Sequence, residues 1–222
     1  TLDNNLKFKT RLVDCVGYLV DNAIGYLEDD MPRMVKTPWS DEEIPFEKAA
    51  EIGTKKVIDE HSTIGILITT DGTVTDIPRQ DYIKAEERVV SELKALNKPF
   101  IILLNSEEPN SSYTVELAEK LSDKYQASVM PINCAELSIE DINTMFSKLL
   151  YEFPTQQIAI KFPRWIDGLD FNHPIKTELF NEIKNAFEDI HVLKDVSHCI
   201  TKISQTEIIS RTTIVNMELG SG

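Results

Sequence analysis

The stretch Pro99-Phe-Ile-Ile-Leu-Leu-Asn-Ser106 is a run of apolar residues that stops at two polar ones. A continuous apolar run of this length is typical of a β-strand that is covered on both faces. A similar run, Ile64-Gly-Ile-Leu-Ile68, precedes it, and the shorter Ala127-Ser-Val-Met-Pro-Ile132 follows it. We therefore predict three buried strands.

The segments around these strands have helical periodicity. Apolar residues recur every three or four positions in 45–61, 81–96 and 111–125. Ser138-Ile-Glu-Asp141 forms a capping box that predicts the start of a further helix. Because helices alternate with buried strands, we predict right-handed crossovers and an α/β fold with a three-layer, mostly parallel sheet.

A nucleotide-site pattern precedes these elements, in Arg11-Leu-Val-Asp-Cys-Val-Gly-Tyr18. Residues 6–13 are predicted to form a strand that ends at Asp14. In P-loop nucleotide hydrolases, Asp-x-x-Gly after a strand holds a water on Mg²⁺ and brings a glycine amide to the γ-phosphate, which are the roles expected for Asp14 and Gly17. The alternative is an aspartate that simply ends a strand at a turn.

The strand ends are predicted to meet at one edge of the sheet. Asp14, Thr70, Asn105 and Cys134 each follow a predicted strand, and open α/β sheets bind ligands at this edge. We expect the loops after the later strands to hold a base. Any doubly wound domain has polar strand ends, so this arrangement is also compatible with no ligand at all.

Composition excludes some classes of function. The 222 residues carry a net charge of −14, which argues against a nucleic acid partner. No apolar run approaches the length of a membrane span. Three cysteines without metal spacing suit a reducing cytoplasm, and the four scattered histidines are interpreted as structural.

Two further segments have a distinct character. Residues 18–44 are long for a connection, and we interpret them either as a second switch that responds to the γ-phosphate or as an acidic surface loop with Trp39 as a packing anchor. The sequence changes character at Pro154, so we predict domains over 1–153 and 154–222. In the second, we predict a strand over 155–162, a turn over 163–165, a helix over 175–191 and two strands over 199–219, the start of an α+β domain.

Several stretches carry a family resemblance. Besides Arg11–Tyr18, they are Met31-Pro-Arg-Met34, Glu60-His-Ser-Thr-Ile-Gly65, Ile68-Thr-Thr-Asp-Gly-Thr73, Ala85-Glu-Glu-Arg-Val89 and Tyr151-Glu-Phe-Pro154. Together they resemble the stage IV sporulation protein A family of spore-coat morphogenetic ATPases.

This resemblance implies a P-loop NTPase domain, related to translation-factor GTPases, that hydrolyses ATP with Mg²⁺, followed by a middle domain. It implies self-polymerisation into the basement layer of the spore coat. The expected place is the mother-cell cytoplasm, peripheral on the outer forespore membrane. The expected partners are further copies of the protein, a small amphipathic membrane-bound sporulation peptide and other coat morphogenetic proteins.

Site residues follow from the same resemblance. Asp14 matches the Walker B aspartate, and Gly17 matches the switch glycine after it. Asn105 matches the first residue of the Asn-Lys-x-Asp motif of related GTPases, but Ser106 stands where that motif has lysine. Glu108 stands at the position of the aspartate in that motif. The two replacements together favour ATP over GTP. Cys134 and Ala135 stand beside the base and are expected to contribute backbone contacts.

One motif is missing from the sequence. Gly-x-x-x-x-Gly-Lys-Ser/Thr occurs nowhere in the 222 residues, and we expect the chain to be a fragment that is inactive alone. A GTP-dependent switch and a non-enzymatic structural assembly module remain as alternative functions.

Overall fold

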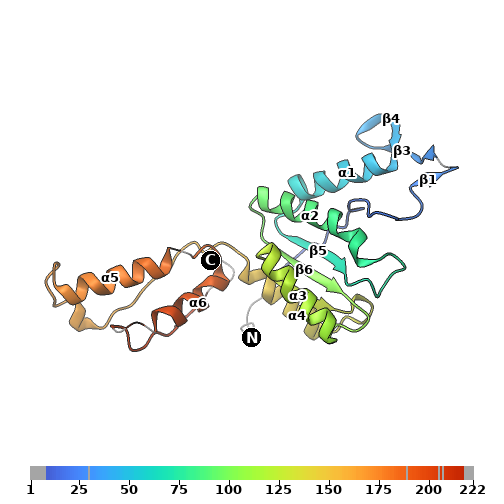
Figure 1. Cartoon of the computed structure of the whole chain (residues 1–222). Coiled ribbons are helices and arrows are strands. Elements are labelled where there is room, and N and C mark those ends of the chain that lie inside the picture. The colour runs from blue at the N-terminus through green and yellow to red at the C-terminus, as the bar shows by residue number, and fades with distance from the viewer. Residues whose placement is uncertain (1–8, 30, 189, 205, 207, 218–222) are drawn as a thin grey trace. The chain divides into compact units, whose positions relative to one another are not determined.

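The computed structural model describes all residues except 1–8, 30, 189, 205, 207 and 218–222. The chain divides into two compact units, Thr1–Ser147 and Lys148–Gly222, each of which is considered by itself (Figure 1). Within the described residues, no helix has the length and apolar character needed to cross a membrane.

The first unit is built on a three-stranded parallel sheet in the order β5-β6-β7. These strands are Gly65–Thr70, Phe100–Asn105 and Val129–Ile132. Helices α2 (Arg79–Ala95) and α3 (Ser112–Tyr125) connect them in turn. The predicted alternation of strands and helices is thus confirmed, and the architecture is that of an α/β fold.

The central strand β6 organises the core. Its Phe100, Ile102 and Leu104 belong to one buried cluster with Leu93 of α2 and Leu121 of α3, so both helices pack on the same face of the sheet. The alternate residues Ile101 and Leu103 are also buried, which confirms that β6 is covered on both faces.

Strand β5 differs from the prediction, because it is not fully covered. Ile68 is 59% exposed, although the apolar run Ile64–Ile68 predicted burial on both faces. Strand β5 pairs with β6 on one side and with no other strand of the described residues. A continuous apolar sequence indicates what a strand can bury, whereas its exposure depends on the neighbours that the fold supplies.

Two helices flank the sheet elements in sequence. Helix α1 (Phe46–Lys56) continues into a π-helical turn at Val57–His61, and α4 covers Ile139–Tyr151. The predicted capping box is confirmed. The Ser138 Oγ accepts from the Asp141 amide at 3.1 Å, and the Asp141 carboxylate accepts from the Ser138 amide at 2.9 Å.

The segment between Tyr18 and α1 is more ordered than the predicted long connection. It forms two small antiparallel hairpins, and Trp39 at the tip of the second lies against α1, since a Cβ on Gly53 would come 3.4 Å from the Trp39 ring. This contact is the packing role that the surface-loop interpretation of residues 18–44 gives to Trp39. The hairpin strands are β1 (Leu27–Glu28), β2 (Met31–Pro32), β3 (Met34–Thr37) and β4 (Ser40–Pro45).

The strand predicted before Asp14 is not formed by its described residues. Residues 9–13 have no strand assignment, while 6–8 lie outside the described residues. A strand needs a neighbour to accept and donate its backbone hydrogen bonds, and no described strand pairs with 9–13. Asp14 therefore follows an irregular segment in this chain rather than a strand.

The regular elements of the second unit are helical in its described residues, apart from one isolated bridge. It contains a 3₁₀ turn at Arg164–Ile166, helix α5 (Pro174–Phe187) and helix α6 (Leu193–Ile203). The prediction of a helix over 175–191 is confirmed in its main part. Cys199 and Ile203 of α6 pack in one buried cluster with Ala186 of α5.

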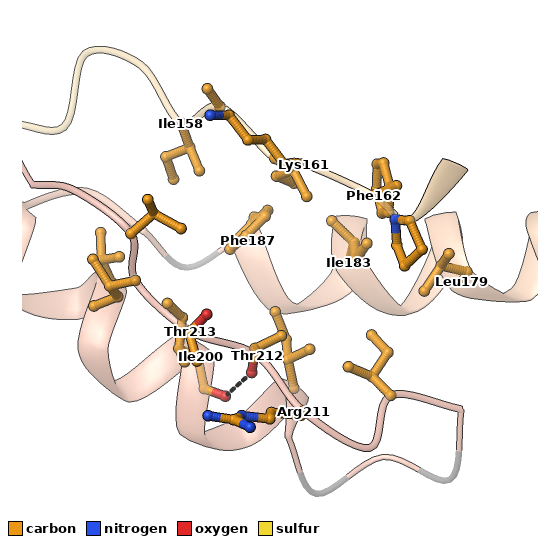
Figure 2. Close-up of a pocket in the computed structure, with 18 of the residues that line it drawn as sticks. Ile158, Lys161, Phe162, Leu179, Ile183, Phe187, Ile200, Arg211, Thr212 and Thr213 are labelled. Carbon is orange, nitrogen blue, oxygen red and sulfur yellow. Dashed lines mark hydrogen bonds between the residues drawn. The ribbon is translucent and has the colours of Figure 1, made fainter. Parts of the chain in front are cut away.

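The strand predictions in the second unit are wrong for the described residues. Residues 199–203 belong to α6, because Leu193, Val196, Ile200 and Ile203 recur at three and four positions and present one face. Residues 156–162 belong to no strand and run along one side of an apolar pocket of this unit (Figure 2), and Pro154, just before them, forms an isolated bridge with Val192. Residues 205, 207, 218 and 219 of the two strands predicted over 199–219 lie outside the described residues. The domain boundary at Pro154 stays a prediction.

Candidate functional site

The carboxyl edge of the sheet gathers the ends of β5, β6 and β7. Thr70, the last residue of β5, is in register with Asn105, which is in register with Ile132. The Asp71 amide donates to the Asn105 carbonyl at 3.3 Å, and the Ser106 amide donates to the Ile132 carbonyl at 2.9 Å. The three loops that follow the strands therefore start side by side.

Asn105 uses its side chain to hold the loop after β7. Its Oδ1 accepts from the Cys134 amide at 2.9 Å. The Asn133 Oδ1 accepts in turn from the Ala135 amide at 3.0 Å and caps the short 3₁₀ turn Cys134–Glu136. The structure thus brings together Asn105, Cys134 and Ala135, three of the predicted nucleotide-binding residues. Their part in binding a nucleotide stays a prediction.

Cys134 has no character of a nucleophile in this site. Burial raises the pKa of its thiol above the ordinary value. The thiol therefore stays protonated near neutral pH, and a thiolate is the reactive form of cysteine. Its contribution to the edge is the backbone amide that Asn105 holds.

Asp71 is the most heavily engaged carboxylate at this edge, and the sequence analysis did not single it out. It is 4% exposed and accepts from the Thr73 amide at 3.0 Å, the Thr73 hydroxyl at 2.6 Å and the Thr114 hydroxyl at 2.8 Å. It therefore joins the loop after β5 to the first turn of α3. The available signal was an aspartate directly after a buried strand, followed by Gly72, whose φ of 96° permits the tight turn.

The same contacts set the charge of Asp71. Burial by itself would raise the pKa of this carboxyl, but the hydrogen bonds from Ser106, Thr73 and Thr114 outweigh burial and hold the pKa below its usual value. A carboxylate that accepts several hydrogen bonds favours its ionised form. Asp71 is thus a buried negative charge that fixes the loops of the edge.

Replacing Asp71 with asparagine is expected to lower the free energy of unfolding of the first unit by about 1.5–3 kcal/mol, the range for hydrogen bonds to a charged group. Because the folded pKa is depressed, the stabilisation is complete above the unfolded pKa of about 4 and is lost as the pH falls through the folded pKa. Urea unfolding across this pH range, followed by Trp39 fluorescence in a Trp165→Phe background, measures the difference. The exposed Asp76→Asn in the same loop is the control, and a pH-independent difference for Asp71→Asn would contradict the assignment.

The Asp14–Gly17 motif lies in an irregular segment. Asp14 is exposed, and within the described part of the chain it forms no hydrogen bond or ion pair with Asn105 or Cys134. Gly17 has a φ of 82°, which favours glycine, and a Cβ there would meet no atom within 4 Å. The structure thus explains the glycine, but it does not bring the motif to the other predicted residues.

Tyr18, which follows the motif, is anchored on α2. Its hydroxyl donates to Glu92, and the Arg88 guanidinium lies 4.0 Å from the centre of its ring. Burial, reinforced by the hydrogen bond to Glu92, raises the pKa of Tyr18. This anchor fixes the far end of the motif while Asp14 itself remains in solvent.

Asp14 is the one predicted protein ligand for the expected Mg²⁺. Within the described ranges, no three His, Cys, Asp or Glu side chains gather closely enough to hold a metal ion. Asp14 offers one exposed carboxylate, which fits Mg²⁺ in nucleotide sites, where one or two carboxylates, water and phosphate oxygens share the coordination.

A buried charge cluster lies behind the edge. The Arg79 guanidinium contacts both carboxylate oxygens of Glu86, at 2.9 and 2.8 Å, and the Tyr125 hydroxyl donates to Glu86 at 2.6 Å. Arg79 also reaches the hydroxyl of Thr69 near the end of β5 at 3.5 Å. This cluster, which we call the Glu86 cluster, joins β5, α2 and α3.

Ser106 and Glu108 stand at the positions that recognise guanine in related GTPases. Ser106 is completely buried, and its hydroxyl accepts from the Glu108 amide at 3.0 Å and lies 3.3 Å from the Thr114 hydroxyl. Glu108 is exposed. Ser106 is thus part of the support beneath the edge and offers no side chain to a ligand above it.

Known proteins match this chain over its whole length. The family model for stage IV sporulation protein A, ATPase domain, matches residues 1–154, and the model for the middle domain of the same protein matches residues 155–222. Curated relatives named stage IV sporulation protein A are 45% identical in Clostridioides difficile (strain 630), 43% in Bacillus subtilis (strain 168) and 42% in Bacillus anthracis.

Each of these alignments extends over 221 residues. It covers 100% of this chain and 45% of the length of the relative. The chain therefore spans less than half the length of the curated relatives it matches. No solved structure matches it. By the two domain models and these identities, the chain belongs to the stage IV sporulation protein A family.

Proposed function

We propose that this chain is part of a sporulation protein that hydrolyses ATP, with Mg²⁺, to drive its own polymerisation into the basement layer of the spore coat. The observation that carries the proposal is the match of an ATPase-domain model to residues 1–154. The protein would act at the surface of the forespore, on the side of the mother-cell cytoplasm. Its partners would be further copies of itself, a small amphipathic membrane-bound peptide and other coat proteins.

The carboxyl edge supports a nucleotide role. In α/β proteins, ligands bind at the carboxyl ends of parallel strands, and here Asn105 and the Cys134 and Ala135 amides are held there by hydrogen bonds. The proposal assigns these residues to the base and Asp14 and Gly17 to the phosphate end. Asp14 would hold Mg²⁺ through water, and the open space around Gly17 would let its amide approach the γ-phosphate.

The outer edge of β5 supports a larger sheet of the P-loop NTPase type. In the described residues this edge is unpaired, and the apolar Ile68 next to it is exposed. The unpaired backbone groups of a sheet edge are a template on which a further strand can pair. The proposal places the phosphate-binding strand and loop of the full-length protein beside β5.

Ser106 supports ATP rather than GTP. A site that recognises guanine contains polar groups that hydrogen-bond to guanine and that would be left unpaired against adenine. Such unpaired groups discriminate strongly between the two bases. The serine that replaces the stacking lysine is buried and points into the support beneath the edge. The test is hydrolysis of Mg-ATP and Mg-GTP by the full-length protein: faster ATP turnover that GTP does not inhibit supports the proposal, and a preference for GTP would favour the alternative of a GTP-dependent switch.

This chain alone is expected to bind ATP more weakly than about 1 mM and to show no turnover. The reason is that its sequence contains no Gly-x-x-x-x-Gly-Lys-Ser/Thr, so the β- and γ-phosphates lack both the lysine and the nest of amides. Calorimetric titration with Mg-ATP, next to the full-length protein as the positive control, measures the binding. Turnover by this chain at the rate of the full-length protein would contradict the expectation.

A further inference from the structure

The segment that carries Asp14 and Gly17 has no polar contact of its own with the rest of the first unit. Among the described residues, 9–17 form no hydrogen bond and no ion pair. Asp14 is exposed, and a Cβ at Gly17 would meet no atom within 4 Å. The position of the motif therefore depends on how the chain is held directly after it.

Tyr18 is the first residue after the motif that is held by other elements. Its hydroxyl donates to the Glu92 carboxylate, and the Arg88 guanidinium lies 4.0 Å from the centre of its ring. A cation at this distance over an aromatic face is attracted by the negative charge of that face. The side chain of Tyr18 is thus held on α2 both at its hydroxyl and at its ring, one residue away from Gly17.

Arg88 connects this contact to a second helix. Its Nε lies 3.2 Å from a carboxylate oxygen of Glu92, and another nitrogen of the same guanidinium pairs with Glu51 of α1. A guanidinium is planar and has several donors, so it can contact two carboxylates and an aromatic face at once, which a lysine ammonium cannot do equally well. Tyr18, Glu51, Arg88 and Glu92 form one group, which we call the Tyr18 anchor.

A second contact fixes the direction in which the chain leaves the anchor. The Asn22 side-chain amide donates to the Asp81 carboxylate, in the first turn of α2, at 2.8 Å. Asp81 and Arg88 are about 10 Å apart along the helix axis, at 1.5 Å per residue. Residues 18–22 can span this distance, because a chain covers at most about 3.5 Å per residue. The segment after the motif therefore lies along α2.

We propose that Arg88 is a positioning residue for ATP hydrolysis, which acts through Tyr18 to hold the Asp14–Gly17 segment at the phosphate end of the nucleotide site. This role rests on the proposed function, which assigns Asp14 and Gly17 to that end. Arg88 itself touches no ligand. Small misplacements of reacting groups slow a reaction strongly, whereas the base is held elsewhere, at Asn105. The Tyr18 anchor therefore affects turnover more than binding of ATP.

Steady-state hydrolysis of Mg-ATP by the full-length protein tests the proposal. Arg88→Ala is expected to lower kcat by about 10-fold, while KM for ATP stays within about 2-fold. Tyr18→Leu should cause the same loss, and the double variant no further loss, because both residues act through one contact. Lys84→Ala, which removes an exposed cation one turn earlier on α2, is the control. A kcat of Arg88→Ala equal to that of the control, or losses that multiply in the double variant, would overturn the proposal.

Fluorine NMR on the full-length protein without nucleotide provides a second measurement. With 3-fluorotyrosine in place of Tyr18, Arg88→Ala is expected to sharpen the signal and move it toward that of free 3-fluorotyrosine, and Lys84→Ala to leave it unchanged. An unchanged signal in Arg88→Ala would overturn the proposal. An unsubstituted protein without ATP turnover would overturn the proposed function, and with it the kinetic role of Arg88, while the NMR signal would still report the Tyr18 anchor.

Discussion

Replacing Asp14 with alanine in the full-length protein is expected to lower ATP turnover by at least about 100-fold, the scale on which loss of one preorganised charge-stabilising group acts. The physical reason is that the proposed carboxylate fixes the water-bound Mg²⁺ that neutralises charge on the transferred phosphoryl group. Since Asp14 is exposed and supports no packing, its removal should leave the fold unchanged.

The matched control is Asp21→Ala, which removes an exposed carboxylate seven positions later in the same irregular region. Steady-state phosphate release at saturating Mg-ATP measures turnover, and circular dichroism checks the fold. Polymerisation is followed in parallel by light scattering. Loss of both turnover and polymerisation in Asp14→Ala alone agrees with an assembly ATPase, whereas intact polymerisation would favour the structural assembly module.

The sheet was predictable because its signal is local. Strand β6 and helices α2, α3 and α4 have hydrophobic patterns that lie within their own residues and do not depend on one particular neighbour. The capping box at Ser138 needs only residues within one helical turn. Elements whose partners lie far away could not be placed so well. Residues 9–13 and 156–162 have strand-like sequences, but a strand exists only when another segment supplies its hydrogen bonds.

The candidate site was predictable to a similar degree. Asn105 and Cys134 were placed on one edge because parallel strands must end there. Asp71 was missed because its role depends on Thr114, which is far away in sequence and comes close only through the fold. In α6, a run rich in β-branched residues favoured a strand, and burial of one helical face against α5 decided the outcome.

Replacing Glu86 with alanine is expected to lower the free energy of unfolding of the first unit by about 3–5 kcal/mol, the cost of breaking one side of a buried ion pair. The substitution leaves the nearly buried Arg79 guanidinium without its carboxylate and the buried Tyr125 hydroxyl without its acceptor. Burial, together with the bond to Glu86, also raises the pKa of Tyr125, so this hydroxyl remains a donor.

The neighbouring residue provides the control. Glu87 forms an ion pair with Lys124 at 2.6 Å, but both side chains are about half exposed, so Glu87→Ala is expected to cost less than about 1 kcal/mol. Urea unfolding monitored by Trp39 in the Trp165→Phe background compares the two variants. Equal losses of stability would contradict the assignment of the Glu86 cluster as the buried link between β5, α2 and α3.

A combined variant separates the value of the pair from the cost of breaking it. When Arg79→Met, Glu86→Leu and Tyr125→Phe are made together, the buried ion pair and the Tyr125 hydroxyl are removed as a unit, and the Thr69 hydroxyl loses only its 3.5 Å contact with Arg79. Apolar replacements of buried ion pairs are often neutral or stabilising. The combined variant should therefore be more stable than Glu86→Ala. This result would show that the stability lost in Glu86→Ala comes from the unpaired Arg79 charge and Tyr125 hydroxyl rather than from the missing attraction between Arg79 and Glu86.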